Sequence, residues 1–188
     1  MKQQLFYKIR AIFYLVTVAT LAVIVMSACR HLEVAGGALE LPRAEILSKT
    51  WPAQIVGITD GDTVKVRLQG EGDQIKIRLY GIDAPEKGQP FGRKSREFLM
   101  ELTLIGSTIT VEPVNFDRYD RLVAILYDAD GRCLNQALVE AGLAWVYPRY
   151  CRQPVCASWS RAEELARRNR TGLWTETSPT PPWEWRKR

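Results

Sequence analysis

Histidine is almost absent from this chain of 188 residues, which contains one, His31, ahead of the expected globular domain. Without histidine in that domain, catalysis by Ser-His-Asp triads, by Cys-His pairs or by nuclease designs with a histidine base is excluded. The chain also lacks a GxxxxGK[ST] loop, which argues against a nucleoside triphosphatase. Any catalysis must therefore come from carboxylates, arginines and a metal.

Cysteine is scarce as well, with four residues. Cys151 and Cys156 stand five positions apart, and Pro154 between them favours a bend, so a local disulfide is predicted. Such a bond suits a compartment outside the cytosol. A zinc site would need further Cys or His ligands nearby, and Cys133 lies among apolar neighbours that predict a core position.

The first residues have the pattern of an export segment. Lys2, Lys8 and Arg10 form a positive start, and residues 11–28 then carry no charge. This pattern predicts a signal peptide or a membrane anchor over residues 1–28. Met26-Ser27-Ala28-Cys29 resembles a degenerate lipoprotein box, which makes Cys29 a lipidation candidate. We therefore expect an exported protein that is periplasmic, at the cell surface or secreted, with possible attachment to the membrane.

Composition predicts one globular domain with a real core, because 46% of the residues are hydrophobic and 25% are charged. Residues 29–50 show no clear periodicity and are interpreted as a linker. The domain is expected over residues 51–176. Residues 177–188, rich in proline and tryptophan, are expected to be an extended tail.

Short alternating segments predict a barrel. Strands are expected at residues 53–59, 64–68, 75–79, 108–114 and 122–127, and helices at 91–104, 134–141 and 157–169. Glycines are expected to end the last two helices. This order predicts an α+β fold, mainly β: a five-stranded OB-type barrel with about three packed helices.

Carboxylates stand at the ends of two predicted strands. Asp62 follows the Asp60-Gly61 turn, and Asp83-Ala84-Pro85-Glu86 closes the third strand. Two carboxylates and a backbone carbonyl make a loose oxygen site of the kind that Ca²⁺ accepts more readily than Mg²⁺. The alternative is that both sequences are ordinary turns.

Two arginines strengthen the catalytic interpretation. Arg78 precedes the Asp83 turn, and Arg121 lies directly before the fifth strand. A planar guanidinium can hold two oxygens of the five-coordinate phosphorus that forms during phosphodiester hydrolysis. Strand alternation alone does not bring Arg78 to Asp83, so a bend at Gly81 is required.

These motifs together resemble the staphylococcal (thermo)nuclease family. The resemblance spans roughly residues 54–174, and the C-terminal part looks like bacterial exported members. It rests on the segments Ile58-Thr59-Asp60-Gly61-Asp62-Thr63-Val64, Arg78-Leu79-Tyr80-Gly81-Ile82-Asp83-Ala84-Pro85-Glu86 and Asp117-Arg118-Tyr119-Asp120-Arg121. The resemblance implies an OB barrel that cleaves DNA and RNA with Ca²⁺ and leaves 3′-phosphates.

The resemblance also implies a role for each residue. Asp62, Asp83 and the Ala84 carbonyl would bind Ca²⁺, and Glu86 would orient or deprotonate the attacking water. Arg78 and Arg121 would clamp the phosphate and stabilise the transition state.

Three tyrosines are further candidate site residues, and the sequence differs from the family pattern at two places near the site. Tyr119, Tyr147 and Tyr150 are candidates for contact with a nucleotide. For Tyr147 and Tyr150, stacking under a base and core packing are both open. The loop after Glu86 is shorter than in the founding enzyme, and Asp120 replaces a glycine beside Arg121.

Two other classes of function compete with a nuclease: a catalytically silent OB-fold module that binds nucleic acid, and a structural lipoprotein of the envelope. The silent module would be expected to lack one or more of the five polar residues of the family pattern, yet all five are present. DNA and RNA are therefore the expected partners, no protein partner is implied, and a monomer is expected.

Overall fold

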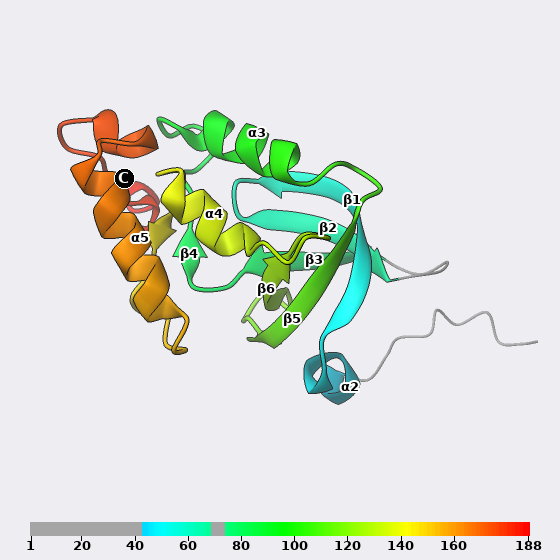
Figure 1. Cartoon of the computed structure of the whole chain (residues 1–188). Helices are drawn as coiled ribbons and strands as arrows, with labels where there is room; N and C mark the ends of the chain where they lie inside the picture. Colours follow the sequence, from blue (N-terminus) through cyan, green and yellow to red (C-terminus); the bar gives the residue numbers. More distant parts are fainter. Residues whose placement is uncertain (1–42, 69–73) are drawn as a thin grey trace, which may run out of the picture. The chain divides into compact units, whose positions relative to one another are not determined.

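A computed structural model of the chain describes residues 43–68 and 74–188 (Figure 1). The predictions for residues 1–28, for Cys29 and for most of the linker lie outside these residues. Within the described ranges, no helix is both long enough and apolar enough to cross a membrane.

Five strands close into a barrel in the order β1-β2-β3-β6-β5. Their bounds are β1 Trp51–Asp60, β2 Thr63–Leu68, β3 Gln74–Leu79, β5 Thr108–Phe116 and β6 Leu122–Tyr127. Every neighbouring pair is antiparallel except β3 and β6, which are parallel. The strands whose alternation predicted a buried face do bury it, with Val64, Val66 and Ile77 fully inaccessible. The OB-type barrel is thus confirmed.

Three helices accompany the barrel: α3 Gly92–Leu102 and α4 Leu134–Glu140 pack against it, and α5 Cys156–Arg168 packs against α4. They are the three predicted helices, with bounds that differ from the prediction by at most two residues. Figure 1 shows α4 between the barrel and α5, in agreement with its contacts to β6 and to α5. The predicted pairs Glu163–Arg167 and Glu164–Arg168 are present on α5, at 3.3 and 2.8 Å.

Two glycines end helices as predicted, and their contacts explain why. Gly142 and Gly172 have φ of +61° and +59°, in the left-handed region that favours glycine. A Cβ on Gly142 would lie 2.2 Å from the Thr171 carbonyl oxygen. The end of α4 and the end of α5 therefore touch through their backbones, which fixes the second helix against the third.

A second sheet, which periodicity did not predict, connects the barrel to this helical part. Strand β4, Ile82–Asp83, pairs antiparallel with β7, Trp145–Val146. Each strand has two residues, too few to show an alternating pattern. The pairing places Asp83 opposite Trp145 and so brings the Asp83 turn beside the segment that follows α4.

Two predictions about the ends of the domain were wrong in part. A helix, α2 Arg43–Ser48, lies within the expected linker, and another, α6 Pro182–Trp185, lies within the tail expected to be extended. Pro182 occupies the first turn of α6, where the missing N–H costs nothing. A 3₁₀ turn, η1 Gly172–Thr175, joins α5 to this C-terminal segment.

Candidate active site

Asp62 begins the site at the turn between β1 and β2. Its side chain is almost fully buried and accepts hydrogen bonds from the Ala84 amide, at 2.6 Å, and from the Thr63 hydroxyl, at 3.1 Å. Gly61 permits this position, because a Cβ there would lie 2.0 Å from the Ser95 Oγ of α3. The turn is thus packed directly against α3, and Asp62 is fixed against the backbone of the Asp83 turn.

The bend that brings Asp83 to the site occurs at Gly81. This glycine has a φ of +68°, and a Cβ on it would lie 2.6 Å from the Cys151 Sγ. After the bend, Asp83 is completely buried in β4. Its Oδ1 lies 2.6 Å from Nη2 of Arg78, so the bend does supply the proximity that strand alternation could not.

Arg78 joins the two buried carboxylates. Its Nη1 pairs with Asp62 Oδ2 and also donates to the Asp62 carbonyl oxygen, at 3.3 Å. Its other terminal nitrogen pairs with Asp83. The Arg78 side chain is 15% exposed, so one planar cation is held at the edge of the site with its geometry fixed from two sides.

The electrostatics of this cluster favour additional positive charge. The pKa of Asp62 is raised to about 7, chiefly by burial and also by the nearby Asp60 and Asp83 carboxylates, although Arg78 opposes the shift. The charged form of Asp62 is therefore disfavoured even beside a bound arginine, and a further cation would stabilise it. Its donors are hard oxygen atoms, which suit Ca²⁺ or Mg²⁺ rather than a thiophilic metal.

The carboxylates nevertheless do not form a ready-made metal cage. Across residues 43–68 and 74–188, no group of three or more His, Cys, Asp or Glu side chains is arranged to hold a metal ion. Asp62, Asp83 and Glu86 each have an arginine against them instead. The chemistry of the donors therefore fits a divalent cation, while guanidinium groups hold the oxygens in this arrangement.

Glu86 lies at the open side of the cluster, with its side chain 40% exposed. The Glu86 amide donates to Gln89 Oε1 at 3.1 Å, and the Gln89 amide donates back to the Glu86 carbonyl at 2.8 Å. Gly92 completes the turn, because a Cβ there would lie 1.9 Å from that same carbonyl oxygen. The short loop noted in the sequence is thus a tight turn that fixes Glu86 at the rim.

Arg186 is the residue of the site that sequence reasoning missed. Its guanidinium pairs with Asp83 Oδ2 at 2.7 Å and with Glu86 Oε1 at 2.5 Å, and it also donates to Asp83 Oδ1 at 3.3 Å. Burial acts to lower the pKa of Arg186, but Asp83 and Glu86 outweigh this and raise it, so the group remains charged. The cluster of basic residues at the C-terminus was the available signal, but nothing in the sequence indicated that it folds back.

Arg121 is not part of the cluster. Within the described chain it is held by Asp117, with Nη2 and Nε at 2.6 and 2.7 Å from Oδ2. Burial acts to raise the pKa of Asp117, but hydrogen bonds from Arg121 and the Tyr119 amide outweigh it and leave that pKa below its usual value. Strands β3 and β6 run parallel, and Arg78 of β3 lies opposite Val123 of β6. Arg121 directly precedes β6, so it lies near β3, the strand that carries Arg78.

The carboxylate of Asp120 has a partner of its own. Asp120 has a φ of +63°, a conformation that Asp tolerates better than most residues. Its exposed carboxylate pairs with Arg43 of α2. The aspartate at position 120, which replaces the family's glycine, therefore has its charge compensated by an ion pair with α2.

The candidate tyrosines lie at the surface or at the rim rather than in the core. Tyr119 is 63% exposed beneath the guanidinium groups of Arg118 and Arg121, and Tyr150 is 55% exposed. Tyr147 is half-buried and makes an edge contact with Tyr150 at 4.8 Å between ring centroids. The alternative of core packing is therefore excluded for Tyr150.

A disulfide holds the segment that carries Tyr147 and Tyr150. Cys151 and Cys156 are bonded, as their spacing predicted, with 2.02 Å between the sulfurs. The amides of Arg152 and Gln153 donate to the Tyr80 hydroxyl at 2.8 and 3.1 Å. These bonds connect the loop to the residue just before the Gly81 bend. The third cysteine of the described residues, Cys133, is partly rather than fully buried.

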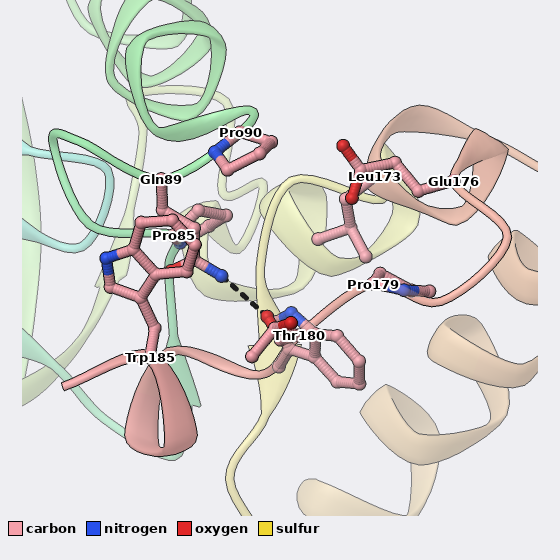
Figure 2. A pocket seen from close by; sticks show the side chains of 9 residues that line it. Pro85, Gln89, Pro90, Leu173, Glu176, Pro179, Thr180 and Trp185 are labelled. Atoms are coloured by element: carbon pink, nitrogen blue, oxygen red, sulfur yellow. Dashed lines mark hydrogen bonds between the residues drawn. The ribbon is translucent and has the colours of Figure 1, made fainter. Parts of the chain in front are cut away.

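A small pocket lies between the Glu86 turn and the C-terminal segment (Figure 2). Pro85, Gln89 and Pro90 line one side, and Thr180 and Trp185 are among the residues of the other. Its volume of about 40 Å³ admits only a few water molecules, so it is too small for a nucleotide. Figure 2 shows the hydrogen bond from Gln89 to the Thr180 backbone crossing it.

The fold and the cluster together define a class of enzyme. A closed OB-type barrel with two buried carboxylates, a bridging arginine and a third carboxylate at the rim has the parts needed to hydrolyse a phosphodiester.

Comparison with known proteins agrees with this class. Residues 76–176 match the model of the family described as staphylococcal nuclease homologue. An uncharacterized endonuclease of Escherichia coli O157:H7 is 39% identical over 146 residues, which cover 74% of this chain and 92% of the relative. A micrococcal nuclease of Shigella flexneri is 36% identical over 142 residues, covering 71% and 79%.

The chain therefore belongs to the staphylococcal nuclease family. As a member it is a nuclease, a hydrolase of phosphodiester bonds, and nucleases of this family are generally metal-dependent.

Proposed function

We propose that this protein is a calcium-dependent nuclease that hydrolyses both DNA and RNA at the P–O5′ bond and leaves 3′-phosphates. The observation that carries the proposal is the Arg78 guanidinium bound to two buried carboxylates, Asp62 and Asp83, with Glu86 at the open rim. The direction and product of cleavage rest on the family resemblance.

Asp62, Asp83 and the Ala84 carbonyl would hold the cation. The Ala84 amide already bonds to Asp62 Oδ2, so the backbone of this turn lies directly against the first carboxylate. When bound, Ca²⁺ would supply Lewis-acid charge neutralisation at the phosphate oxygens. The raised pKa of Asp62 supports a cation at this position, because a divalent ion would offset the burial and the repulsion that disfavour the charged carboxylate.

Arg78 and Arg121 would hold the phosphate. Both guanidinium groups are fixed by carboxylates, Arg78 by Asp62 and Asp83 and Arg121 by Asp117, so each keeps its orientation before substrate arrives. A planar guanidinium can give two parallel hydrogen bonds to phosphate oxygens, and these strengthen as charge accumulates on the five-coordinate phosphorus.

Glu86 would orient the water and accept its proton. The water oxygen forms the new bond to phosphorus, the P–O5′ bond breaks, and the 5′ oxygen leaves with a proton from solvent. A carboxylate at the rim of the site is reachable by solvent and substrate, as a general base must be. Tyr119, Tyr147 and Tyr150 would stack on bases near the cut.

We also propose that the protein works outside the cytosol. The positive start, the uncharged residues 11–28 and the candidate lipid site at Cys29 support export. The Cys151–Cys156 disulfide supports an oxidising compartment.

Degradation of single-stranded DNA and of RNA by the full chain, with Ca²⁺ and with chelator, tests the proposal. Arg78→Ala should lower the rate by about 10² to 10³, the typical loss of one transition-state donor. Arg93→Ala is the matched control, because Arg93 is a surface arginine paired with Glu97 and 79% exposed. Cleavage that survives chelation would refute the calcium mechanism. Binding of DNA without cleavage in either condition would favour the silent binding module.

A further inference from the structure

Residues 177–188, here called the C-terminal strap, lie across the candidate active site. Gln89 Nε2 donates to the Thr180 carbonyl at 2.5 Å, which ties the strap to the turn that carries Glu86. Six residues later Arg186 reaches Asp83 and Glu86. The strap lies beyond residues 76–176, the part of the chain that matches the family model.

The strap's arginine uses the oxygens that catalysis would need. Asp83 Oδ2 accepts from Arg186 at 2.7 Å, and Asp83 Oδ1 accepts from both Arg186, at 3.3 Å, and Arg78, at 2.6 Å. Arg186 also binds Glu86 Oε1 at 2.5 Å. A divalent cation held by Asp83 would lie against this guanidinium and be repelled by it. Arg186 and the cation therefore compete for Asp83, and Glu86 is occupied while the strap is in place.

The strap's tryptophan uses a surface that a base would need. Trp183 stacks on Tyr147 with 4.7 Å between ring centroids and an interplanar angle of 11°. Trp145 supports the indole by an edge contact at 5.8 Å. A nucleobase that stacked on this face of Tyr147 would need the position of the indole.

We propose that the C-terminal strap is an intramolecular inhibitor that occupies the active site until calcium and nucleic acid displace it. The inference rests on the proposed function: the guanidinium of Arg186 takes the place of the cation, and the indole of Trp183 takes the place of a base. The strap is suited to release, because α6 has only four residues and a helix of that length is not stable by itself.

Calcium binding to the full chain, measured by titration calorimetry, tests the competition directly. Arg186→Gln should lower the dissociation constant about tenfold if the wild-type site is open about a tenth of the time. Lys187→Gln is the control, since it removes the same charge from an exposed neighbour in the strap. A constant for Arg186→Gln equal to or weaker than that of wild type would overturn the proposal. A tenfold loss of cleavage by Arg186→Gln at saturating calcium would also overturn it, because that result would mean that Arg186 binds the phosphate instead.

Carbodiimide labelling of Glu86, read by mass spectrometry in chelator, tests the docked strap without any metal. Arg186→Gln should increase the labelling several-fold, whereas Lys187→Gln should leave it unchanged. Equal labelling in wild type, Arg186→Gln and Lys187→Gln would refute the docking of the strap over Glu86, even if calcium binds. Increased labelling in Arg186→Gln together with no calcium binding in any of the proteins would support the strap and refute the calcium part of the proposed function.

Discussion

Replacement of Arg78 by methionine should reveal how strongly the two buried carboxylates depend on this arginine. Asp62 and Asp83 have side chains 9% and 1% exposed, and both bind Arg78. Removal of one partner from a buried ion pair costs about 3–5 kcal/mol, because the remaining charge has lost its compensation. We expect Arg78→Met to lower the free energy of unfolding, measured in urea with chelator present, toward the lower part of that range, since Arg186 still binds Asp83.

A second substitution separates this cause from simple loss of packing. Asp62→Asn keeps the shape of the side chain but removes one of the charges that Arg78 compensates. If uncompensated charge causes the destabilisation, Asp62→Asn should recover about 1–2 kcal/mol in the Arg78→Met background and cost stability in the wild type, a coupling typical of contacting residues. Arg93→Met, at an exposed pair, should change stability by no more than about 0.5 kcal/mol. Additive effects of the two site substitutions would refute the electrostatic reasoning.

Two further predictions concern the supports of the site. Gly61→Ala should destabilise the domain by about 1–3 kcal/mol and reduce cleavage, because its Cβ would lie 2.0 Å from the Ser95 Oγ and displace Asp62. Gly88→Ala is the matched control, since its Cβ would meet nothing within 4 Å. Equal effects of the two substitutions on urea unfolding and on cleavage would contradict the steric argument. Asp117→Asn should lose a pH-dependent part of stability: the folded pKa of Asp117 lies below its ordinary 3.8, so its stabilisation is complete above pH 3.8 and disappears as the pH falls through the folded value. Urea unfolding at pH 7, 5 and 3 should therefore show a gap between wild type and variant that narrows only at pH 3, and a constant gap would exclude ionisation of Asp117 as its cause.

The regular elements of the barrel were predictable because each depends on local information. Alternation in β2 and β3 specified which side of each strand faces the core, and the observed burial of Val64, Val66 and Ile77 follows it. The ends of α4 and α5 were marked by Gly142 and Gly172, which have the positive φ that favours glycine. The strands β4 and β7 were not predictable, because two residues of extended chain carry no period.

The candidate site also has a part that the sequence predicted and a part that it did not. Asp62, Arg78, Asp83 and Glu86 come from two short motifs, and a bend at Gly81 was enough to bring them together. Arg121, predicted to share their task, pairs with Asp117 outside the cluster, since its position depends on how β6 enters the barrel beside β3.

The sequence by itself therefore determined the class of fold, the residue types available for chemistry and the motifs that carry the carboxylates, because hydrophobic period, turn chemistry and residue inventory are local properties. Only the tertiary structure decided that Arg186 lies against Asp83 and Glu86, which precede it by 103 and 100 residues. Contacts at such separations depend on the packing of the whole domain. In this chain the docking of the C-terminal strap follows from the contacts of Trp183 with Tyr147 and of Gln89 with Thr180, none of which has a signature in the local sequence.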